Sequence, residues 1–168
     1  AQIVVLTGNP KTGVTNVAIE NSIKEIKNEL GQDIIVAAGK MHAAGSLEQG
    51  KSALASMEDL ERFIKAGADI IIVPAPGTRQ GATVEYVSQA ADLAHMNKKL
   101  LMTAVGTSQE SSDIETIRTI ALYSKMAGAD LHHLGDGAFG GMAPPENILE
   151  YSIVIRGKRH TYKRMAMR

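Results

Sequence analysis

Two glycine-rich segments in the C-terminal part of the chain carry residue types that bind anions. Residues 105–109 read Val-Gly-Thr-Ser-Gln, and residues 135–141 read Gly-Asp-Gly-Ala-Phe-Gly-Gly. Closely spaced glycines let backbone N–H groups approach an anion without an obstructing Cβ, and hydroxyl groups add donors. The alternative is that these glycines only make tight turns. The sequence predicts a phosphate or carboxylate site made by Gly106, Thr107, Ser108, Gln109, Gly135, Gly137, Gly140 and Gly141.

Lys40 and His42 end an apolar run that starts at Asp33. Alternate residues of a strand share a face, so the two side chains are expected on the same side. A lysine at a buried strand end could lose its charge through desolvation and act as a base or an imine-forming nucleophile. It could instead stay charged and neutralise an anion, and this is the role that we favour. Lys40 and His42 are therefore candidate catalytic residues.

His132 and His133 are consecutive, so on a strand they face opposite sides. One is expected to be a hydrogen-bonded core histidine, and sequence alone leaves open which. The other, with His42 and Asp136, could form a proton relay or a His/His/Asp metal cluster. The spacing is not diagnostic of a metal site, so a divalent metal is not favoured and no metal ligands are assigned.

Asn9 and Thr78 follow the first and third strand-like segments and could hydrogen-bond a polar ligand. Solvated loop polarity explains them equally well. Residues 10–13 read Pro-Lys-Thr-Gly, as in part of a phosphate-binding loop, but the preceding glycine spacing is wrong for a Walker A motif. A nucleotide hydrolase is therefore not expected.

The elements that must position these residues repeat along the chain. Strand-like runs begin near Gln2, Asp33, Asp69, Lys99 and Asp130, and a helical pattern follows each one. Apolar β-branched runs separated by amphipathic helices are typical of parallel strands in βα units. In such folds the chemistry lies at the carboxyl ends of the strands. The candidate residues above fall at these ends.

Local signals mark the helix boundaries. Thr15 is a predicted N-cap, the Ser112-Asp-Ile-Glu115 run reads as a capping box, and Pro145 suits a first helical turn. Gly67-Ala-Asp69 and Gly128-Ala-Asp130 repeat one pattern of helix stop and strand entry. The chain is thus expected to be a single α/β domain over residues 1–168.

Two architectures accept five βα units. A doubly wound sheet would be complete with five strands, whereas a (β/α)8 TIM-type barrel needs eight. Every predicted strand ends in a polar, glycine-containing loop, and the first turn lacks the G-x-G-x-x-G pattern of a dinucleotide fold. We therefore expect a partial TIM-type barrel and keep the five-stranded doubly wound sheet as the alternative.

Several motifs together resemble a poorly characterised bacterial family of (β/α)8 barrels, distantly similar to phosphoenolpyruvate mutase and other phosphate-binding barrels. The motifs are VLTGNPKTGVTN, AGKMHAAG, PAPGT, TAVGTSQE, GADLHHLGDG and YSIVIRGKRHTYKRM. The resemblance implies that this chain corresponds to the C-terminal five βα units, strands four to eight, of a longer protein. Some members carry a haloacid-dehalogenase-like hydrolase label, but the chain has no Asp-x-Asp motif for that chemistry.

Composition limits the function classes. The chain has no cysteine, which excludes disulfides and thiolate metal sites, and no apolar run of the roughly 18 residues that span a bilayer. With no visible signal peptide, a cytoplasmic location is expected. Residues 151–168 carry six basic and no acidic residues, while residues 1–150 carry 12 basic and 18 acidic residues. A closing helix or a subunit contact explains this basic end better than nucleic-acid binding, which we regard as unlikely.

The sequence therefore favours a barrel enzyme that binds a small phosphorylated or carboxylated metabolite, with lyase, isomerase or hydrolase chemistry. The alternatives are a non-catalytic anion-binding or regulatory barrel and a folded, inactive fragment. Five strands cannot close a barrel, and interior residues such as Ile35, Ile71 and Met102 would be exposed. The sequence analysis thus expects a homo-oligomer, or completion of the barrel by further N-terminal chain.

Overall fold

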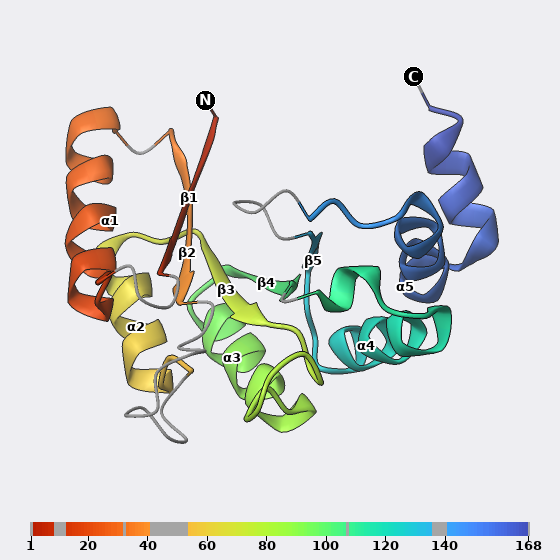
Figure 1. Cartoon of the computed structure of the whole chain (residues 1–168). Helices are drawn as coiled ribbons and strands as arrows, with labels where there is room; N and C mark the ends of the chain where they lie inside the picture. Colours follow the sequence, from red (N-terminus) through yellow and green to blue (C-terminus); the bar gives the residue numbers. More distant parts are fainter. Residues whose placement is uncertain are drawn as a thin grey trace.

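The computed structural model shows an open parallel sheet with helices along its outer side (Figure 1). It describes residues 2–8, 13–31, 33–40, 54–106, 108–135 and 141–167. Within these ranges no helix is both long and apolar enough to cross a membrane. The strands are β1 (Ile3–Gly8), β2 (Ile35–Lys40), β3 (Ile70–Pro74), β4 (Leu100–Val105) and β5 (Leu131–Leu134), and the helices are α1 (Asn16–Leu30), α2 (Met57–Ala66), α3 (Val84–Met96), α4 (Ile114–Met126) and α5 (Pro145–Met165), with a short 3-10 turn at Gln109–Ser111.

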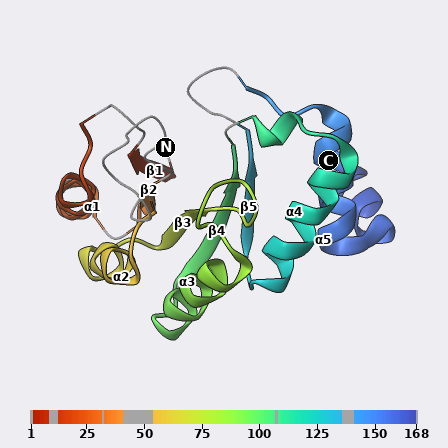
Figure 2. The same ribbon diagram turned by 60° about the horizontal axis from the view of Figure 1, so that its bottom comes forward.

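The strand order is that of a barrel sector. All strand pairs are parallel, and the order in the sheet is the order in the chain, β1-β2-β3-β4-β5. A doubly wound sheet reverses its strand order at a switch point and carries helices on both faces. Here the sheet curls and the helices follow its convex side, as Figures 1 and 2 both show. The predicted partial TIM-type barrel is confirmed.

Strand alternation sorts the core into two layers. Val36, Ala38, Ile71 and Leu101 belong to the large cluster that packs against the helices. The residues of opposite parity form a smaller cluster on the concave face, which consists of Ala37, Ile70, Ile72 and Ala104. Since neighbouring strands are in register, each residue's face follows from its pairing partner.

The concave face is apolar and partly open near β1. Ile3 and Val5 are 50% and 57% exposed, and Ile35 is 40% exposed. The sequence analysis also expected Ile71 on this face, which is wrong: Ile71 is 1% exposed among the helix-packed residues. The reason is register, because Ala38 pairs with Ile71 and shares its helix-facing side. The edge strands of the described sheet, β1 and β5, are each unpaired on their outer side.

Helix starts follow local capping chemistry. The Thr15 side chain accepts from the Ala18 N–H at 3.1 Å, and Pro145 occupies the first helical position of α5, both as predicted. The start of α4 differs from the prediction by one residue. Its N-cap is Asp113, whose carboxylate accepts from the Thr116 N–H at 2.9 Å, whereas Ser112 is extended and lies outside the helix.

The aspartates of the two Gly-Ala-Asp repeats join the amino ends of neighbouring strands by hydrogen bonds. The Asp69 N–H donates to the Val36 carbonyl at 2.8 Å, and the Val36 N–H donates to the Asp69 carboxylate at 3.1 Å. Asp130 makes the same pair of bonds with Leu101, at 2.9 and 2.8 Å. An aspartate suits this position because its short side chain reaches the backbone N–H of the second residue of the adjacent strand. The repeat therefore has a structural role.

Gly39 allows β2 to lie unusually close to β3. A Cβ added at Gly39 would lie 2.0 Å from the Ile72 carbonyl oxygen, which no side chain can accommodate. Glycine is used where two backbones approach this closely. This contact fixes the position at which Lys40 leaves the sheet.

Candidate functional site

The carboxyl ends of β4 and β5 bring two of the predicted anion-binding segments together. The Gly135 N–H donates to the Val105 carbonyl at 3.0 Å. A Cβ at Gly106 would lie 3.4 Å from the Gly135 carbonyl oxygen, and a Cβ at Gly135 would lie 3.2 Å from that of Gly141. Three candidate glycines from both segments are thus neighbours at one end of the sheet. Thr107, Gly137 and Gly140 lie outside the described residues.

The loop after β4 is held in an uncommon conformation. Ser108 has a φ of 72°, in the left-handed region that non-glycine residues rarely occupy, and it is exposed. Gln109 then begins the 3-10 turn that leads to α4. Such backbone strain persists only where surrounding contacts impose it, and it gathers at functional sites.

Sequence reasoning missed two residues that shape this loop. Asn147, from the first turn of α5, donates through Nδ2 to the carbonyls of Glu110 at 3.0 Å and Ser112 at 2.8 Å. Glu110 is 4% exposed, and its Oε2 is buried with no hydrogen-bond partner in the part of the chain that the structure describes. Burying a polar atom without a partner is costly, so this oxygen favours a donor supplied from elsewhere. Because Asn147 is 37 residues away from Glu110, no local pattern could reveal the contact.

The N-terminus of α4 is already occupied. The Asp113 carboxylate accepts from both the backbone N–H and the hydroxyl of Thr116, each at 2.9 Å. The hydrogen bond from the Thr116 N–H lowers the pKa of Asp113, so a negative charge sits at the positive end of the helix dipole. This helix end is capped by the chain itself.

His132 is a core histidine. It faces the helices, and its Nδ1 lies 3.1 Å from the Thr103 hydroxyl and 3.1 Å from the Tyr151 hydroxyl. The His132 and Tyr151 rings also contact each other, with centroids 5.3 Å apart. Burial, assisted by the nearby charge of Arg156, lowers the pKa of His132 below its ordinary value of 6.5. Burial likewise raises the pKa of Tyr151. This polar cluster joins β4 and β5 to α5.

His133 faces the other way. It pairs in register with Ala104, which belongs to the concave cluster, and its side chain is exposed. The choice between the two histidines, which the sequence left open, is therefore made by strand register. Of the two, His133 is the one that a ligand in the barrel interior could meet.

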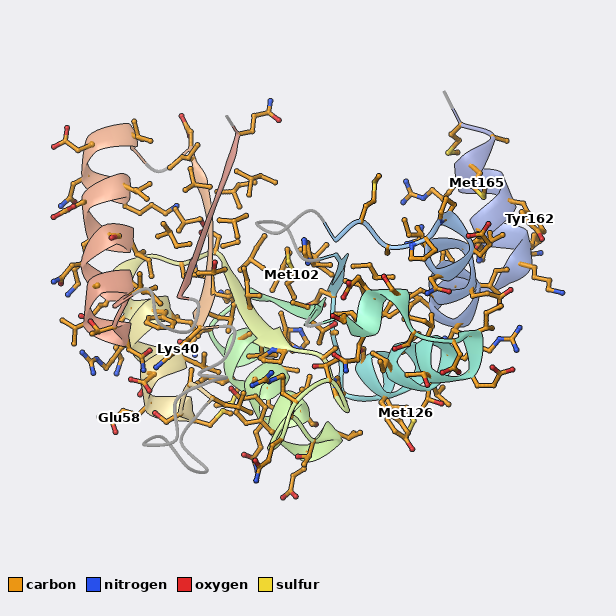
Figure 3. All side chains as sticks on the ribbon, viewed as in Figure 1. Lys40, Glu58, Met102, Met126, Tyr162 and Met165 are labelled. Carbon is orange, nitrogen blue, oxygen red and sulfur yellow. The ribbon has the colours of Figure 1, made fainter. Side chains whose placement is uncertain are left out.

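Lys40 lies on the helix side of the sheet. It has the same parity as Val36 and Ala38, which pack against the helices, and it is half-buried at the end of β2. Figure 3 shows Lys40 close to α2, away from Met102, which packs on the concave cluster. The structure does not bring Lys40 and His133 to the same face.

The remaining predicted residues are mostly not part of the described geometry. Thr78 is buried, and its hydroxyl donates to the Ala75 carbonyl at 2.7 Å, so it closes its own turn. Asn9, His42 and Asp136 lie outside the described residues. Among the side chains that are described, no three of His, Asp or Glu gather as metal ligands do.

The fold and the loop arrangement define a partial TIM-type barrel whose strand carboxyl ends carry the candidate site. The chain belongs to the family described as "Domain of unknown function (DUF7916)", whose model matches residues 1–168. No curated protein matches the chain.

Solved structures with the same fold include two aldolases and a reductase. The chain is 14% identical to the tetrameric deoxyribose phosphate aldolase of Aeropyrum pernix, covering 92% of this chain and 71% of that one, with a TM-score of 0.57. The chain is 12% identical to QR15, an aldolase, covering 93% of this chain and 75% of that one, with a TM-score of 0.58. The chain is 20% identical to the GMP reductase of Trypanosoma brucei in complex with guanosine 5'-triphosphate. The match covers 95% of this chain and 38% of that one, with a TM-score of 0.53. At such identities the likeness establishes the fold. The similarity to phosphoenolpyruvate mutase stays a prediction.

Proposed function

We propose that this chain binds a small phosphorylated metabolite at the carboxyl ends of β4 and β5, as part of a barrel enzyme of the lyase, isomerase or hydrolase type. The observation that carries the proposal is the close approach of Gly106 to Gly135, which places the two glycine-containing loops side by side. Loops after the last strands of a TIM-type barrel commonly bind phosphate. The named neighbours support it too, since one acts on a deoxyribose phosphate and another is complexed with a nucleotide.

Glu110 supports a ligand that carries hydroxyl groups as well as an anion. A carboxylate repels phosphate, so phosphate fits at the glycines and a hydroxyl donor fits Glu110 Oε2, which has no partner among the described residues. A phosphorylated polyol combines both groups. His133, exposed on the concave face, is the candidate proton carrier.

Completion of the barrel belongs to the same proposal. The chain spans 71% and 75% of the two aldolases, and in the described sheet β1 and β5 are each unpaired on their outer side. Further βα units, from the same polypeptide or from another copy, would close the interior around a ligand. An enclosed interior excludes water and strengthens the electrostatic contacts that catalysis needs.

The test is calorimetric titration with inorganic phosphate and with ribose 5-phosphate. Gly106→Ala adds a Cβ at an ordinary contact distance of 3.4 Å from Gly135, whereas Gly106→Val adds two further methyl groups between the loops. We expect the alanine variant to bind phosphate and the valine variant to bind it at least about tenfold more weakly, since charge-assisted bonds contribute roughly 1.5–3 kcal/mol each. Unchanged affinity in a folded valine variant, or no binding by the wild type at millimolar phosphate, would contradict the proposal.

A non-catalytic anion-binding barrel is the second candidate. It is favoured by the separation of Lys40 and His133 on opposite faces of the sheet, because among the described residues these were the basic groups assigned to proton handling. A screen of phosphorylated metabolites distinguishes the two. Ligands that bind but are recovered unchanged favour the binding protein, and turnover that His133→Asn abolishes favours the enzyme.

A further inference from the structure

The terminal half of α5 stands apart from the rest of the chain. Gly157, with φ of 78° and ψ of 159°, breaks α5, so that residues 158–165 form a separate helical segment. Of this segment only Thr161 is buried, and its hydroxyl lies 3.3 Å from that of Ser152 in the preceding part of the helix. All its other residues are exposed. Thr161 therefore defines which side of the segment faces its own chain.

This segment, the basic segment, carries charge that the described chain does not neutralise. The ion pairs found within the described ranges involve other lysines and arginines. Arg159 and Lys163 are one helical turn apart on the side opposite Thr161. Tyr162 lies next to Arg159 around the helix and is 52% exposed, and Met165, at the end of the segment, is 67% exposed. Like charges at this spacing repel each other, so an outside anionic partner would relieve the segment. Among the described residues of the segment, Lys158, Arg159, Lys163 and Arg164 take part in none of these ion pairs.

An acidic surface lies at the opposite edge of the sheet, on α1. Glu25 and Glu29 are one turn apart on α1, both exposed, and the apolar Leu30 beside them is 60% exposed. The nearby cations are already engaged: Lys24 pairs with Glu20 at 2.6 Å, and Lys27 pairs with Asp69 at 2.7 Å. The end of α1 therefore has the same spacing of like charges, with the opposite sign. We call Glu25, Glu29 and Leu30 the acidic end of α1.

We propose that the basic segment of one copy of this chain binds the acidic end of α1 of a second copy. The two surfaces lie at opposite ends of the molecule in both views, so they cannot meet within one chain (Figures 1 and 2). Arg159 and Lys163 would face Glu25 and Glu29, while Tyr162 covers Leu30. Such an interface is head-to-tail, and it generates a ring or an open chain of copies.

The open sheet edges point to the same junction. The acidic end belongs to the helix that follows edge strand β1, and the basic segment belongs to the helix that follows edge strand β5. Unpaired edges are themselves templates for association.

A second copy fits the charges better than a nucleic acid does. Residues 1–150 carry 18 acidic against 12 basic residues, so the body of the chain repels a polyanion that approaches the basic segment. The same excess supplies the acidic surface that a second copy offers. Exposed Tyr162 and Met165 add apolar contact area, which protein interfaces use.

The test is a charge swap followed by sedimentation velocity of the 168-residue chain across a concentration series. We expect the wild type to self-associate and the Arg159→Glu/Lys163→Glu variant to associate at least about tenfold more weakly, because like charges then face each other. The Glu25→Lys/Glu29→Lys variant should be weakened similarly. A chain that carries all four substitutions restores the opposite charges and should associate again, as should a mixture of the two double variants.

A control variant with the same change in net charge tests whether the effect depends on position. Lys65→Glu/Lys125→Glu changes the net charge equally, on exposed positions of α2 and α4, and should leave association unchanged. Circular dichroism verifies that each variant folds. A monomeric wild type, or association that the swaps do not alter, overturns the proposal. It is also overturned if a labelled 20-nucleotide RNA binds the wild type and loses affinity only on reversal of Arg159 and Lys163, without self-association.

Discussion

Two adjacent histidines show how one residue step separates a hydrogen-bonded, partly buried side chain from an exposed one. His132 is held by Thr103 and Tyr151 among the helices, and His133 is exposed on the concave face. Chemically the two are identical. Only the side of the strand decides that the first stabilises the fold and the second is accessible to a ligand.

Acid should destabilise the protein through His132. Burial lowers its pKa in the folded state from 6.5, so the unfolded state binds a proton more readily as the pH falls. Stability from this group is therefore full above about pH 6.5 and declines below it. We expect the free energy of unfolding of the wild type, minus that of His132→Gln, to fall between pH 7.5 and pH 5.5. Urea denaturation of both proteins at each pH measures this difference. His133→Gln is the control, and an equal slope for both variants would contradict the assignment.

Lys40 is expected to contribute through its position beside the helices and not as an imine-forming nucleophile. It shares the helix-facing side with Val36 and Ala38, away from the barrel interior. Lys40→Arg keeps the charge and should retain phosphate binding within about threefold, since only geometry changes. Borohydride reduction in the presence of glyceraldehyde 3-phosphate should leave Lys40 unmodified, as read by peptide mass spectrometry. A reduced adduct at Lys40 would show an imine-forming role instead.

At the scale of elements, the amino ends of the strands carry stabilising contacts, and the carboxyl ends carry the candidate site. The amino ends are joined by Asp69 and Asp130, each bonded to the backbone of the preceding strand. The carboxyl ends carry the glycines, the strained Ser108 and the buried Glu110. This division is general in TIM-type barrels, where loops at the carboxyl ends can vary without disturbing the frame.

Asp69→Asn should destabilise the fold by about 2–3 kcal/mol at pH 7, because it removes charge-assisted bonds and leaves Lys27, which is 7% exposed, without its counterion. Partial burial alone would raise the pKa of Asp69, but hydrogen bonds from Lys27, the Val36 N–H and Lys99 outweigh it and lower the pKa. Stability from this carboxylate is thus present above pH 3.8 and lost as the pH falls further.

Chemical denaturation at pH 7 and pH 3 measures the effect of Asp69→Asn, and the difference from the wild type should shrink in acid. Asp92→Asn, on the exposed side of α3, serves as the control and should change the free energy of unfolding by less than about 0.5 kcal/mol. A cost that does not depend on pH would place the contribution of Asp69 outside its charge.

Gly39→Ala should be among the most destabilising single changes. The added Cβ would lie 2.0 Å from the Ile72 carbonyl oxygen, so β2 and β3 must separate or their pairing must shift. We expect a loss of at least about 3 kcal/mol, in the range of severe backbone and packing defects. Gly106→Ala is the matched control, since its Cβ meets only an ordinary contact at 3.4 Å. Equal melting temperatures for the two variants would contradict the close approach of β2 and β3.

At the scale of the whole molecule, the half-barrel leaves apolar surface open where a closed barrel would hide it. Val5 on β1 is 57% exposed, whereas Val36, on the helix-facing side of the neighbouring strand, is fully buried. Exposed apolar patches on folded proteins occur at interaction sites and at sites of aggregation. The open face and the two bare edges share one origin, namely that five strands make a sector of a barrel.

Aspartate substitutions test which face is open. Val36→Asp places a charge in the core and should prevent folding, while Val5→Asp should change the free energy of unfolding of the monomer by less than about 1 kcal/mol. Circular dichroism and urea denaturation at low protein concentration measure both. If Val5→Asp unfolds the chain as Val36→Asp does, then the concave face is not open to solvent in the way described.

The sequence by itself determined the repeat and its local punctuation. Apolar periodicity predicted five parallel strands in chain order, and Thr15 and Pro145 marked helix starts, because these signals come from residues a few positions apart. The sequence also placed its candidate residues at the carboxyl ends of strands, since that end is fixed by strand direction alone. The error at Ser112 shows the limit of local signals, because two adjacent residues there can both cap a helix.

Only the tertiary structure decided which face each side chain occupies. The face of Ile71, Lys40 and the two histidines depends on register between strands about 30 residues apart, and a shift of one residue reverses it. The burial of Glu110 depends on Asn147, which reaches the loop from another helix. The isolation of the basic segment depends on a break at Gly157. Such features arise from contacts between distant residues, which periodicity and capping patterns do not encode.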